Sequence, residues 1–291
     1  MLATPDAVAA RTSVRPGLLS DARAGLRAMA PQWLRNWREA RFYARYGEVE
    51  LHLLDILCDS ERDAIDVGGN DGAYVHFLRH HCRVVHTYEP EPHLAEALRD
   101  KFELDNVVVH RVALSDRAGT IELHTPVVDG VPVTGCCTVS NDAASNYPAT
   151  RSFSVPVERL DAIYRDEAGF IKIDVEGHQQ AVLDGALQTI ARCRPKMLVE
   201  IIERMSPGGL ATARRMFEEL HYGGWFVHQG QLRPIAEFSL ETMQNKADIP
   251  PMRAHLSERG RFGKYLYNFI FLPAEEESRL VPRLGARLKR L

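Results

Sequence analysis

The chain lacks three features that would assign it to a broad class at once. It has no uninterrupted run of about eighteen apolar residues, so we expect no membrane-spanning helix. Its net charge is only −3 with 26% charged residues, which gives no strong bias toward nucleic acid or membrane surfaces. Its five cysteines include no C-x-x-C pair and no even disulfide framework. We therefore expect a cytoplasmic protein that acts on neither nucleic acid nor membrane.

Two common phosphate-binding motifs are also missing, although a glycine-rich turn is present. Residues 65–72 read Ile-Asp-Val-Gly-Gly-Asn-Asp-Gly, which is neither G-x-G-x-x-G nor a P-loop. Asp71 lies inside the turn, where a pyrophosphate needs bare N–H groups and a positive helix end. Asp66, just before the turn, also suits a cationic ligand better than an anionic one. The simplest alternative is an ordinary tight turn between a strand and a helix.

A second signal follows the glycine turn at the distance typical of nucleotide-binding α/β folds. The apolar segment Val84–Tyr88 ends in Glu89, where such folds place the acid that binds a ribose. The glycines of the turn allow a sharp bend and a close approach of the backbone to a ligand. Together the two segments indicate a cofactor that contains a nucleoside.

The rest of the chain alternates between strand-like and helix-like segments, as a doubly wound sheet requires. Further strands are expected at 106–110, 119–124, 170–175, 197–202, 224–228 and 267–272. Helices are expected at about 93–104, 178–191 and 210–220. We predict an α/β fold with a doubly wound, mostly parallel sheet, preceded by a helical segment.

The ends of the chain differ in composition from this core. Residues 1–47 are rich in arginine and poor in acids, and we expect a helical lid or oligomerisation segment there, with an organelle transit signal as the alternative. Residues 48–273 form the catalytic domain, and 274–291 a basic, solvated terminal helix. A homodimer is an open alternative for the role of the N-terminal segment.

Eight short blocks, in order, resemble the FkbM family of S-adenosylmethionine-dependent methyltransferases, a class I, Rossmann-like group. They are residues 65–72, 88–92, 113–116, 119–123, 155–161, 171–177, 182–186 and 194–201. The block Ile-Lys-Ile-Asp-Val-Glu-Gly at 171–177 is the most distinctive, whereas the glycine turn is shared by all class I methyltransferases. Gly69 departs from the pattern, because the family more often has alanine there.

The resemblance implies a cofactor role for each matching position. The turn, with Gly68, Gly69 and Gly72, passes beneath the methionine part of S-adenosylmethionine, and Asp66 or Asn70 lies near its ammonium or carboxylate. Glu89 accepts hydrogen bonds from both ribose hydroxyls. Two further positions, Ser115 and Asp116, lie at the tip of the third strand near the adenine.

Two of these roles have simple structural alternatives. Glu89 could stabilise the N-terminus of the helix at 93–104 by its charge. Asp116 could be an ordinary turn residue before Gly119.

The acceptor side is predicted from the segment after the fourth core strand. Strand alternation places Lys172, Asp174 and Glu176 on one face, and a lysine in an apolar strand must be paired or exposed. We predict Asp174 as general base or acceptor-orienting group, and His178, which titrates near neutral pH, as second candidate. In the alternative, Asp174 and Glu176 cap the next helix and hold Lys172.

A required metal is not expected, although one is conceivable. Catechol-type methyltransferases hold a divalent cation with carboxylates at the ends of the fourth and fifth strands, where this chain has Asp174 and Glu200. The neighbouring Asp-Asn pair of those enzymes is replaced here by Glu200-Ile201, which removes a ligand from a site that needs several oxygen donors.

The long segment 125–154 is expected to border the acceptor pocket, with Tyr147 and Arg151 as contacts, because connections of this length are functional or disordered. The leading hypothesis is O-methylation of a hydroxylated small molecule such as a sugar, polyketide or other secondary metabolite. N- or C-methylation by the same fold is the first alternative. A nicotinamide-dependent reductase is the second, although no Tyr-x-x-x-Lys pair follows Tyr43 or Tyr46.

Overall fold

The computed structural model describes residues 31–128, 131–132, 137–139, 149–249 and 263–291. The chain divides into two compact units, residues 1–38 and 39–291. The boundary thus falls before the predicted position 47/48, inside helix α2 (Gln32–Tyr46). Within the described residues, no helix has the length and apolarity needed to cross a bilayer. A role of the N-terminal segment as lid or dimer contact stays a prediction.

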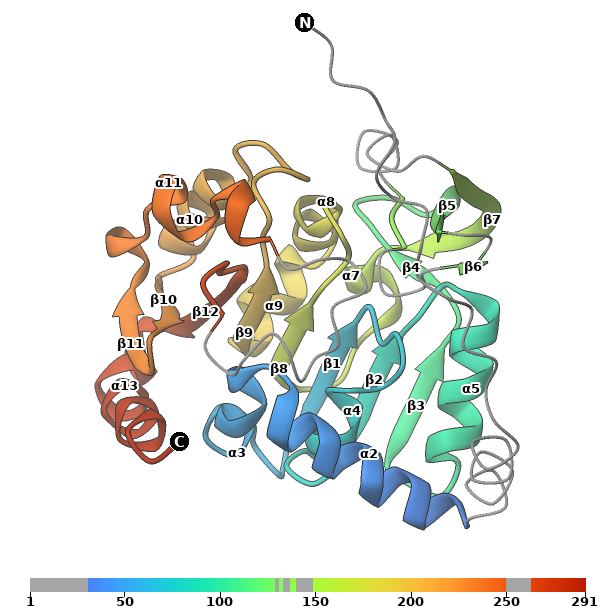
Figure 1. Ribbon diagram of the computed structural model, residues 1–291, viewed down its shortest axis with the longest axis horizontal. Coiled ribbons are helices and arrows are strands. Elements are labelled where there is room, and N and C mark those ends of the chain that lie inside the picture. The colour runs from blue at the N-terminus through green and yellow to red at the C-terminus, as the bar shows by residue number, and fades with distance from the viewer. Residues whose placement is uncertain (1–30, 129–130, 133–136, 140–148, 250–262) are drawn as a thin grey trace, which may run out of the picture. The chain divides into compact units, whose positions relative to one another are not determined.

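The larger unit is built on an eight-stranded sheet with the order β11-β10-β12-β9-β8-β1-β2-β3 (Figure 1). Its parallel part contains β3 (Val107–His110), β2 (Val85–Tyr88), β1 (Asp63–Val67), β8 (Ala168–Ile173) and β9 (Lys196–Glu200). The antiparallel part contains β12 (Asn268–Pro273), β10 (Tyr222–His228) and β11 (Gln231–Pro234). The expected doubly wound α/β fold is confirmed, and the strands expected at 224–228 and 267–272 pair antiparallel as β10 and β12.

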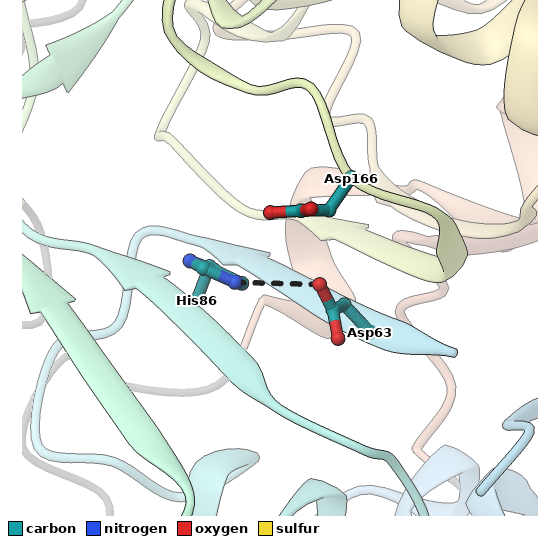
Figure 2. A group of neighbouring side chains, drawn as sticks. All are labelled: Asp63, His86 and Asp166. Atoms are coloured by element: carbon teal, nitrogen blue, oxygen red, sulfur yellow. Dashed lines mark ion pairs between the residues drawn. The ribbon is translucent and has the colours of Figure 1, made fainter. Parts of the chain in front are cut away.

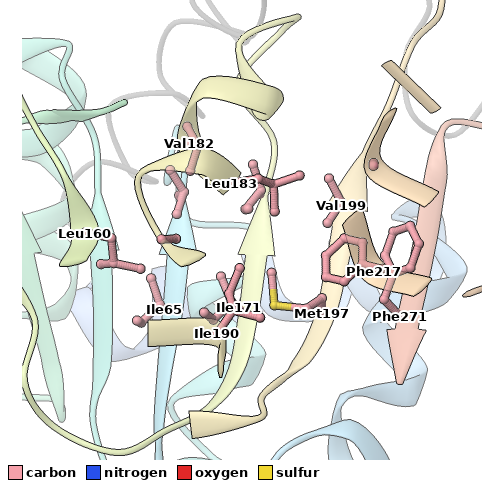
Figure 3. Close-up of a cluster of buried hydrophobic side chains, with 14 of the residues drawn as sticks. Ile65, Leu160, Ile171, Val182, Leu183, Ile190, Met197, Val199, Phe217 and Phe271 are labelled. Atoms are coloured by element: carbon pink, nitrogen blue, oxygen red, sulfur yellow. The ribbon is translucent and has the colours of Figure 1, made fainter. Parts of the chain in front are cut away.

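Successive residues of the central strands alternate between two apolar clusters, one on each face of the sheet. The first cluster joins the strands to helices α7 (Leu160–Ile163), α8 (Gln179–Asp184), α9 (Leu187–Cys193) and α10 (Gly209–Glu219) (Figure 3). The second joins them to η1 (Val49–Leu53), α3 (Leu54–Leu57), α4 (Val75–Leu78), α5 (Pro92–Phe102) and α13 (Ala274–Leu288). Because both faces are covered, the strands are apolar almost throughout.

A second, smaller sheet has the order β4-β7-β5-β6. It contains β4 (Ala113–Leu114), β7 (Thr150–Glu158), β5 (Gly119–Val128) and β6 (Val131–Pro132), and its own apolar cluster includes Leu123 and Val155. Among the described residues between β11 and β12 lie the short elements η3 (Ile235–Glu237), α11 (Leu240–Met243) and η4 (Lys246–Asp248).

Two sequence predictions about the segment after the fourth core strand are corrected by these elements. The helix expected at 178–191 is two helices, because the turn at Gly185 passes so close to the Ser115 carbonyl that a Cβ would lie 1.9 Å from its oxygen. Strand alternation stops at Ile173, where β8 ends, and Glu176 adopts a left-handed φ of +48°.

The terminal helix α13 is not a solvated appendage. Its residues Leu280, Leu284 and Leu288, spaced four apart on one face, are buried in the second apolar cluster. The end of the chain therefore belongs to the core of the larger unit.

The absence of a side chain at Gly69 has a packing reason. A Cβ at this position would lie 2.2 Å from Thr87 Oγ1 and 3.1 Å from Leu98 Cδ1. Since Thr87 is buried and its hydroxyl donates to Asp66 at 3.2 Å, it has little room to move. The alanine that is common in the family does not fit beside a threonine at 87.

We predict that Gly69→Ala lowers the free energy of unfolding by about 1–3 kcal/mol, the usual cost of overpacking. Gly285→Ala is the matched control, because nothing lies within 4 Å of a Cβ added there in α13. The control is expected to be neutral or stabilising by up to about 1 kcal/mol. Urea denaturation measures both, and Thr87→Ala combined with Gly69→Ala should cost less than the sum of the single changes. Equal stability of Gly69→Ala and wild type would contradict this packing account.

Candidate methyl-transfer site

The glycine turn is shaped by close contact between the ends of β1 and β8. Gly68 has a φ of +87°, and a Cβ there would lie 1.9 Å from the Asp174 carbonyl oxygen. The Asp174 N–H donates to the Val67 carbonyl at 3.0 Å, and the Gly68 N–H donates to the Tyr88 carbonyl at 2.9 Å. Only glycine satisfies both the conformation and the contact at position 68.

A cavity opens directly above this turn, at the carboxyl ends of β1, β2 and β8. The strand order reverses beside β1, which is where open α/β sheets bind their ligands. The second sheet and residues 137–139 contribute the opposite wall. The cavity is lined by Val67, Gly68, Asn70, Tyr88, Glu89, Pro90, Ala113, Leu114, Leu123, Cys137, Val139, Asp174, Val175, Glu176 and His178.

Glu89 is the lining residue with the most specific geometry. Its Oε2 accepts the Asn70 N–H at 2.8 Å and its Oε1 accepts the Glu91 N–H at 2.9 Å. Burial, opposed by these two hydrogen bonds, raises the pKa of Glu89 to about 7. Each oxygen has accepted one backbone donor and keeps a lone pair for another.

Glu91, and not Glu89, caps the N-terminus of the next helix with its side chain. Glu91 is the N-cap residue of α5, and its Oε2 accepts the Leu94 N–H at 2.6 Å. The two acids therefore point to different places: Glu89 faces the cavity and Glu91 caps the helix.

Lys172 is buried among carboxylates beneath the cavity. Its Nζ lies 3.0 Å from Asp174 Oδ2, 3.8 Å from Asp66 Oδ1 and 4.6 Å from the centre of the Tyr74 ring. Burial alone would lower the pKa of Lys172, but Asp174, Asp66 and Glu48 together raise it. The predicted pairing of this lysine is thus present.

Asp66 does not reach the cavity lining. It is 1% exposed, and burial, opposed by Lys172, raises its pKa to about 6. In the described structure Asp66 faces Lys172 and the Thr87 hydroxyl below the glycine turn.

Three carboxylates gather beside the cavity, and two of them, Asp174 and Glu176, line it. One oxygen each of Asp174, Glu176 and Glu200 lie within 4.8 Å of one another. Burial and then the nearby Asp174 raise the pKa of Glu176 to about 8, and the same two causes raise the pKa of Glu200. These are the residues at the cavity that could hold a divalent cation, and Glu176 supplies a third oxygen donor beside the two noted in the sequence. A required metal was not expected, and that prediction remains untested.

His178 and Ser115 meet at the other end of the cavity. His178 Nε2 lies 2.9 Å from Ser115 Oγ, and that hydroxyl donates to Asp116 Oδ1 at 3.0 Å. Burial lowers the pKa of His178. The prediction that Ser115 and Asp116 lie at the tip of the third strand is wrong. The third strand, β3, ends at His110, and the two residues instead follow β4 of the second sheet.

Helix capping by the acids after β8 is also absent. The N-cap position of α8 is His178, without a side-chain cap, so neither Asp174 nor Glu176 fills that role. Arg151 lies on β7, is exposed and is not a lining residue of the cavity. Tyr147 lies outside the described residues.

Comparison with known proteins identifies the family to which the chain belongs. A model of the methyltransferase FkbM domain matches residues 66–257, well over half of the chain. The chain belongs to the FkbM methyltransferase family. The resemblance noted in the sequence is thereby confirmed.

Three proteins similar to the chain, one curated relative and two solved structures, are distant from it in sequence. The 2-O-methyltransferase NoeI of Sinorhizobium fredii is 28% identical over 162 residues, which is 50% of this chain and 66% of that protein. A methyltransferase FkbM from Methylobacillus flagellatus KT is 13% identical with a TM-score of 0.45, over 73% of this chain and 44% of that one. An rRNA methylase from Streptococcus thermophilus is 10% identical with a TM-score of 0.42, over 77% of this chain and 93% of that one. The chain thus spans just under two thirds of its curated relative and under half of the first structure.

Sequence reasoning missed one acid near the candidate site, Glu48. Glu48 accepts hydrogen bonds from the hydroxyl of Tyr74 at 2.5 Å, the amide of Asn268 at 2.9 Å and the hydroxyl of Tyr267 at 3.2 Å. Its charge contributes to raising the pKa of Lys172 and the pKa of Glu200. No local signal could have found it, because its partners at 267 and 268 lie more than two hundred residues away in the chain.

We predict that Glu176→Gln changes how stability depends on pH. Because the pKa of Glu176 is raised from 4.5 to about 8, the folded chain holds this proton more tightly than the unfolded chain does. Wild type therefore loses stability progressively as pH rises from about 4.5 to about 8, and the neutral glutamine does not. Between about pH 5 and about pH 9, the free energy of unfolding of the variant should rise relative to that of wild type by on the order of 3 kcal/mol.

Urea denaturation at several pH values measures this difference, and Glu219→Gln on the exposed face of α10 is the control. A constant difference between Glu176→Gln and wild type over the whole pH range would show that Glu176 is ionised at neutral pH like a surface acid.

Proposed function

We propose that the chain is an S-adenosylmethionine-dependent O-methyltransferase that acts on a hydroxyl of a small molecule such as a sugar, polyketide or other secondary metabolite. The single observation that carries the proposal is Glu89, buried at the end of β2 with one free lone pair on each oxygen. A pair of ribose hydroxyls is a donor set that fits these two acceptors. The name of the relative NoeI supports oxygen as the atom that is methylated.

The residues present fit the cofactor on two counts. Apolar side chains of Leu114, Leu123 and Val139 line the cavity and suit an adenine ring. The nearby carboxylates suit a ligand that carries positive charge. When bound, S-adenosylmethionine supplies an electrophilic methyl carbon on a sulfonium.

The residues of the chain would act on the acceptor by orienting it and by taking its proton. Asp174 is our first candidate, because it lines the cavity, its side chain is 31% exposed, and Lys172 fixes it at 3.0 Å. Glu176 and Glu200 adjoin it, and because its pKa is raised to about 8, Glu176 is mostly protonated at neutral pH and suits hydrogen-bond donation to the acceptor rather than removal of its proton. His178 is the second candidate; its contact with Ser115 places its ring toward the second sheet.

The nicotinamide alternative fits the site less well. A dinucleotide needs its pyrophosphate at the glycine turn, and that turn contains Asp71 and adjoins Asp174 and Glu176. N- or C-methylation by the same fold remains the alternative, since both would use the same cofactor residues.

We predict that the purified chain binds S-adenosylhomocysteine and that Glu89→Gln weakens this binding by about tenfold or more, because an amide nitrogen cannot accept a hydroxyl donor. Glu91→Gln is the matched control, since its amide oxygen can still accept the Leu94 N–H at the start of α5 and the change leaves the cavity lining intact. Isothermal titration calorimetry measures both variants, with NADH as the competing ligand.

Tight binding of NADH without binding of S-adenosylhomocysteine would overturn the proposal. If S-adenosylhomocysteine binds as predicted, transfer of a labelled methyl group to a panel of hydroxylated and amine acceptors decides between oxygen and nitrogen. Asp174→Asn should then lower kcat with little effect on cofactor affinity, if Asp174 takes the proton.

A further inference from the structure

A second polar cluster lies at the opposite end of the parallel sheet from the cavity. It consists of Asp63 at the start of β1, His86 on β2, and Asp166 between α7 and β8 (Figure 2). Since a strand rises about 3.3 Å per residue, Asp63 lies about 13 Å from Val67 at the far end of β1. The cluster is therefore separate from the proposed methyl-transfer site.

The ligand atoms of the cluster have the spacing of a metal site. His86 Nε2 lies 3.4 Å from Asp63 Oδ2, and a carboxylate oxygen of Asp166 lies within 4.8 Å of both. Two ligands bonded to a tetrahedral Zn²⁺ at about 2.0–2.1 Å are about 3.3 Å apart. In Figure 2 the Asp166 carboxylate faces the pair formed by His86 and Asp63 from the neighbouring segment.

The surroundings hold two of these ligands in place. Asp63 is 1% exposed, and its Oδ1 accepts from Arg83 Nε at 2.8 Å while its Oδ2 accepts from the Tyr164 hydroxyl at 3.0 Å. His86 Nδ1 lies 3.1 Å from His110 Nε2, so a second imidazole fixes the ring through the nitrogen that faces away from the cluster. Metal-ligating histidines are oriented in this way by a partner on the other nitrogen.

The neighbouring guanidiniums are directed to acceptors other than the Asp166 carboxylate. Arg83 Nε pairs with Asp63 Oδ1 at 2.8 Å, and Arg192 Nη1 donates to the Asp166 backbone carbonyl at 2.9 Å and pairs with Glu167. His86 Nδ1 is in contact with His110 Nε2, which leaves Nε2 as the ring nitrogen directed at the carboxylates of the cluster.

We propose that Asp63, His86 and Asp166 form a binding site for a divalent transition-metal ion of the zinc class, with water completing the coordination. One imidazole nitrogen and two carboxylate oxygens are a ligand set that Zn²⁺ accepts, whereas Mg²⁺ and Ca²⁺ prefer oxygen alone. The site ties the segment before β8 to the starts of β1 and β2, on the face of the sheet that carries α7.

The test uses the full chain, treated with a chelator and then titrated with Zn²⁺ by calorimetry. Wild type should bind one equivalent of Zn²⁺ at this site, and Asp166→Asn should lower the affinity for that equivalent about tenfold or more. Asp166 is exposed, so this change leaves the fold intact. Glu167→Gln, at the adjacent exposed carboxylate, is the matched control and should bind as wild type does.

A further variant separates this site from the acids at the cavity. Glu176→Gln should leave the equivalent assigned to Asp166 unchanged. Co²⁺ added in place of Zn²⁺ should give the visible absorption of a site with a nitrogen ligand, and Asp166→Asn should reduce it. Wild-type affinity in Asp166→Asn, or loss of Zn²⁺ binding in Glu176→Gln alone, would overturn the proposal.

Discussion

The proposed methyl-transfer site depends on one buried ammonium group. Lys172 is 4% exposed and lies between Asp66 and Asp174, the acids at the adjoining ends of β1 and β8. Without it, two carboxylates would face each other at the point where Gly68 is pressed against the Asp174 carbonyl. Removing one partner of a buried ion pair typically costs several kcal/mol, because the other charge is left uncompensated. The lysine thus allows the two strand ends to close into a cavity floor and fixes Asp174 where the acceptor would bind.

One ammonium does not balance all the acids around the cavity, and this imbalance gives the site its chemical character. Burial raises the pKa of Glu89 to about 7 and that of Glu176 to about 8, and it raises the pKa of Glu200 as well. Such groups favour any ligand that brings positive charge or hydroxyl donors. A sulfonium cofactor with a ribose offers both, whereas a pyrophosphate offers neither. The electrostatics of the unliganded site therefore agree with the family to which the chain belongs.

The strands and the place of the cavity at the glycine turn could be predicted from the sequence because both leave local patterns. Apolar segments of strand length marked the parallel core, and the glycine turn and Glu89 follow strands directly. The acceptor side could not be predicted to the same degree. Alternation failed after Ile173 because Glu176 takes a left-handed conformation, and the break at Gly185 comes from a contact with Ser115, seventy residues earlier in the chain. Glu48 and the cluster of Asp63, His86 and Asp166 depend on long-range packing, for which single residues carry no signal. The burial of α13 was missed because its arginines are more conspicuous in the sequence than its leucines.

The most direct test of the account is a crystal structure of the chain with S-adenosylhomocysteine. The account predicts that both ribose hydroxyls lie within hydrogen-bond distance of the two Glu89 oxygens, while the Asn70 and Glu91 N–H groups keep their contacts with the same carboxylate. It also predicts that the homocysteine part passes over Gly68 toward Asp174. A nucleoside bound elsewhere, or a Glu89 side chain turned away from the ribose, would contradict it.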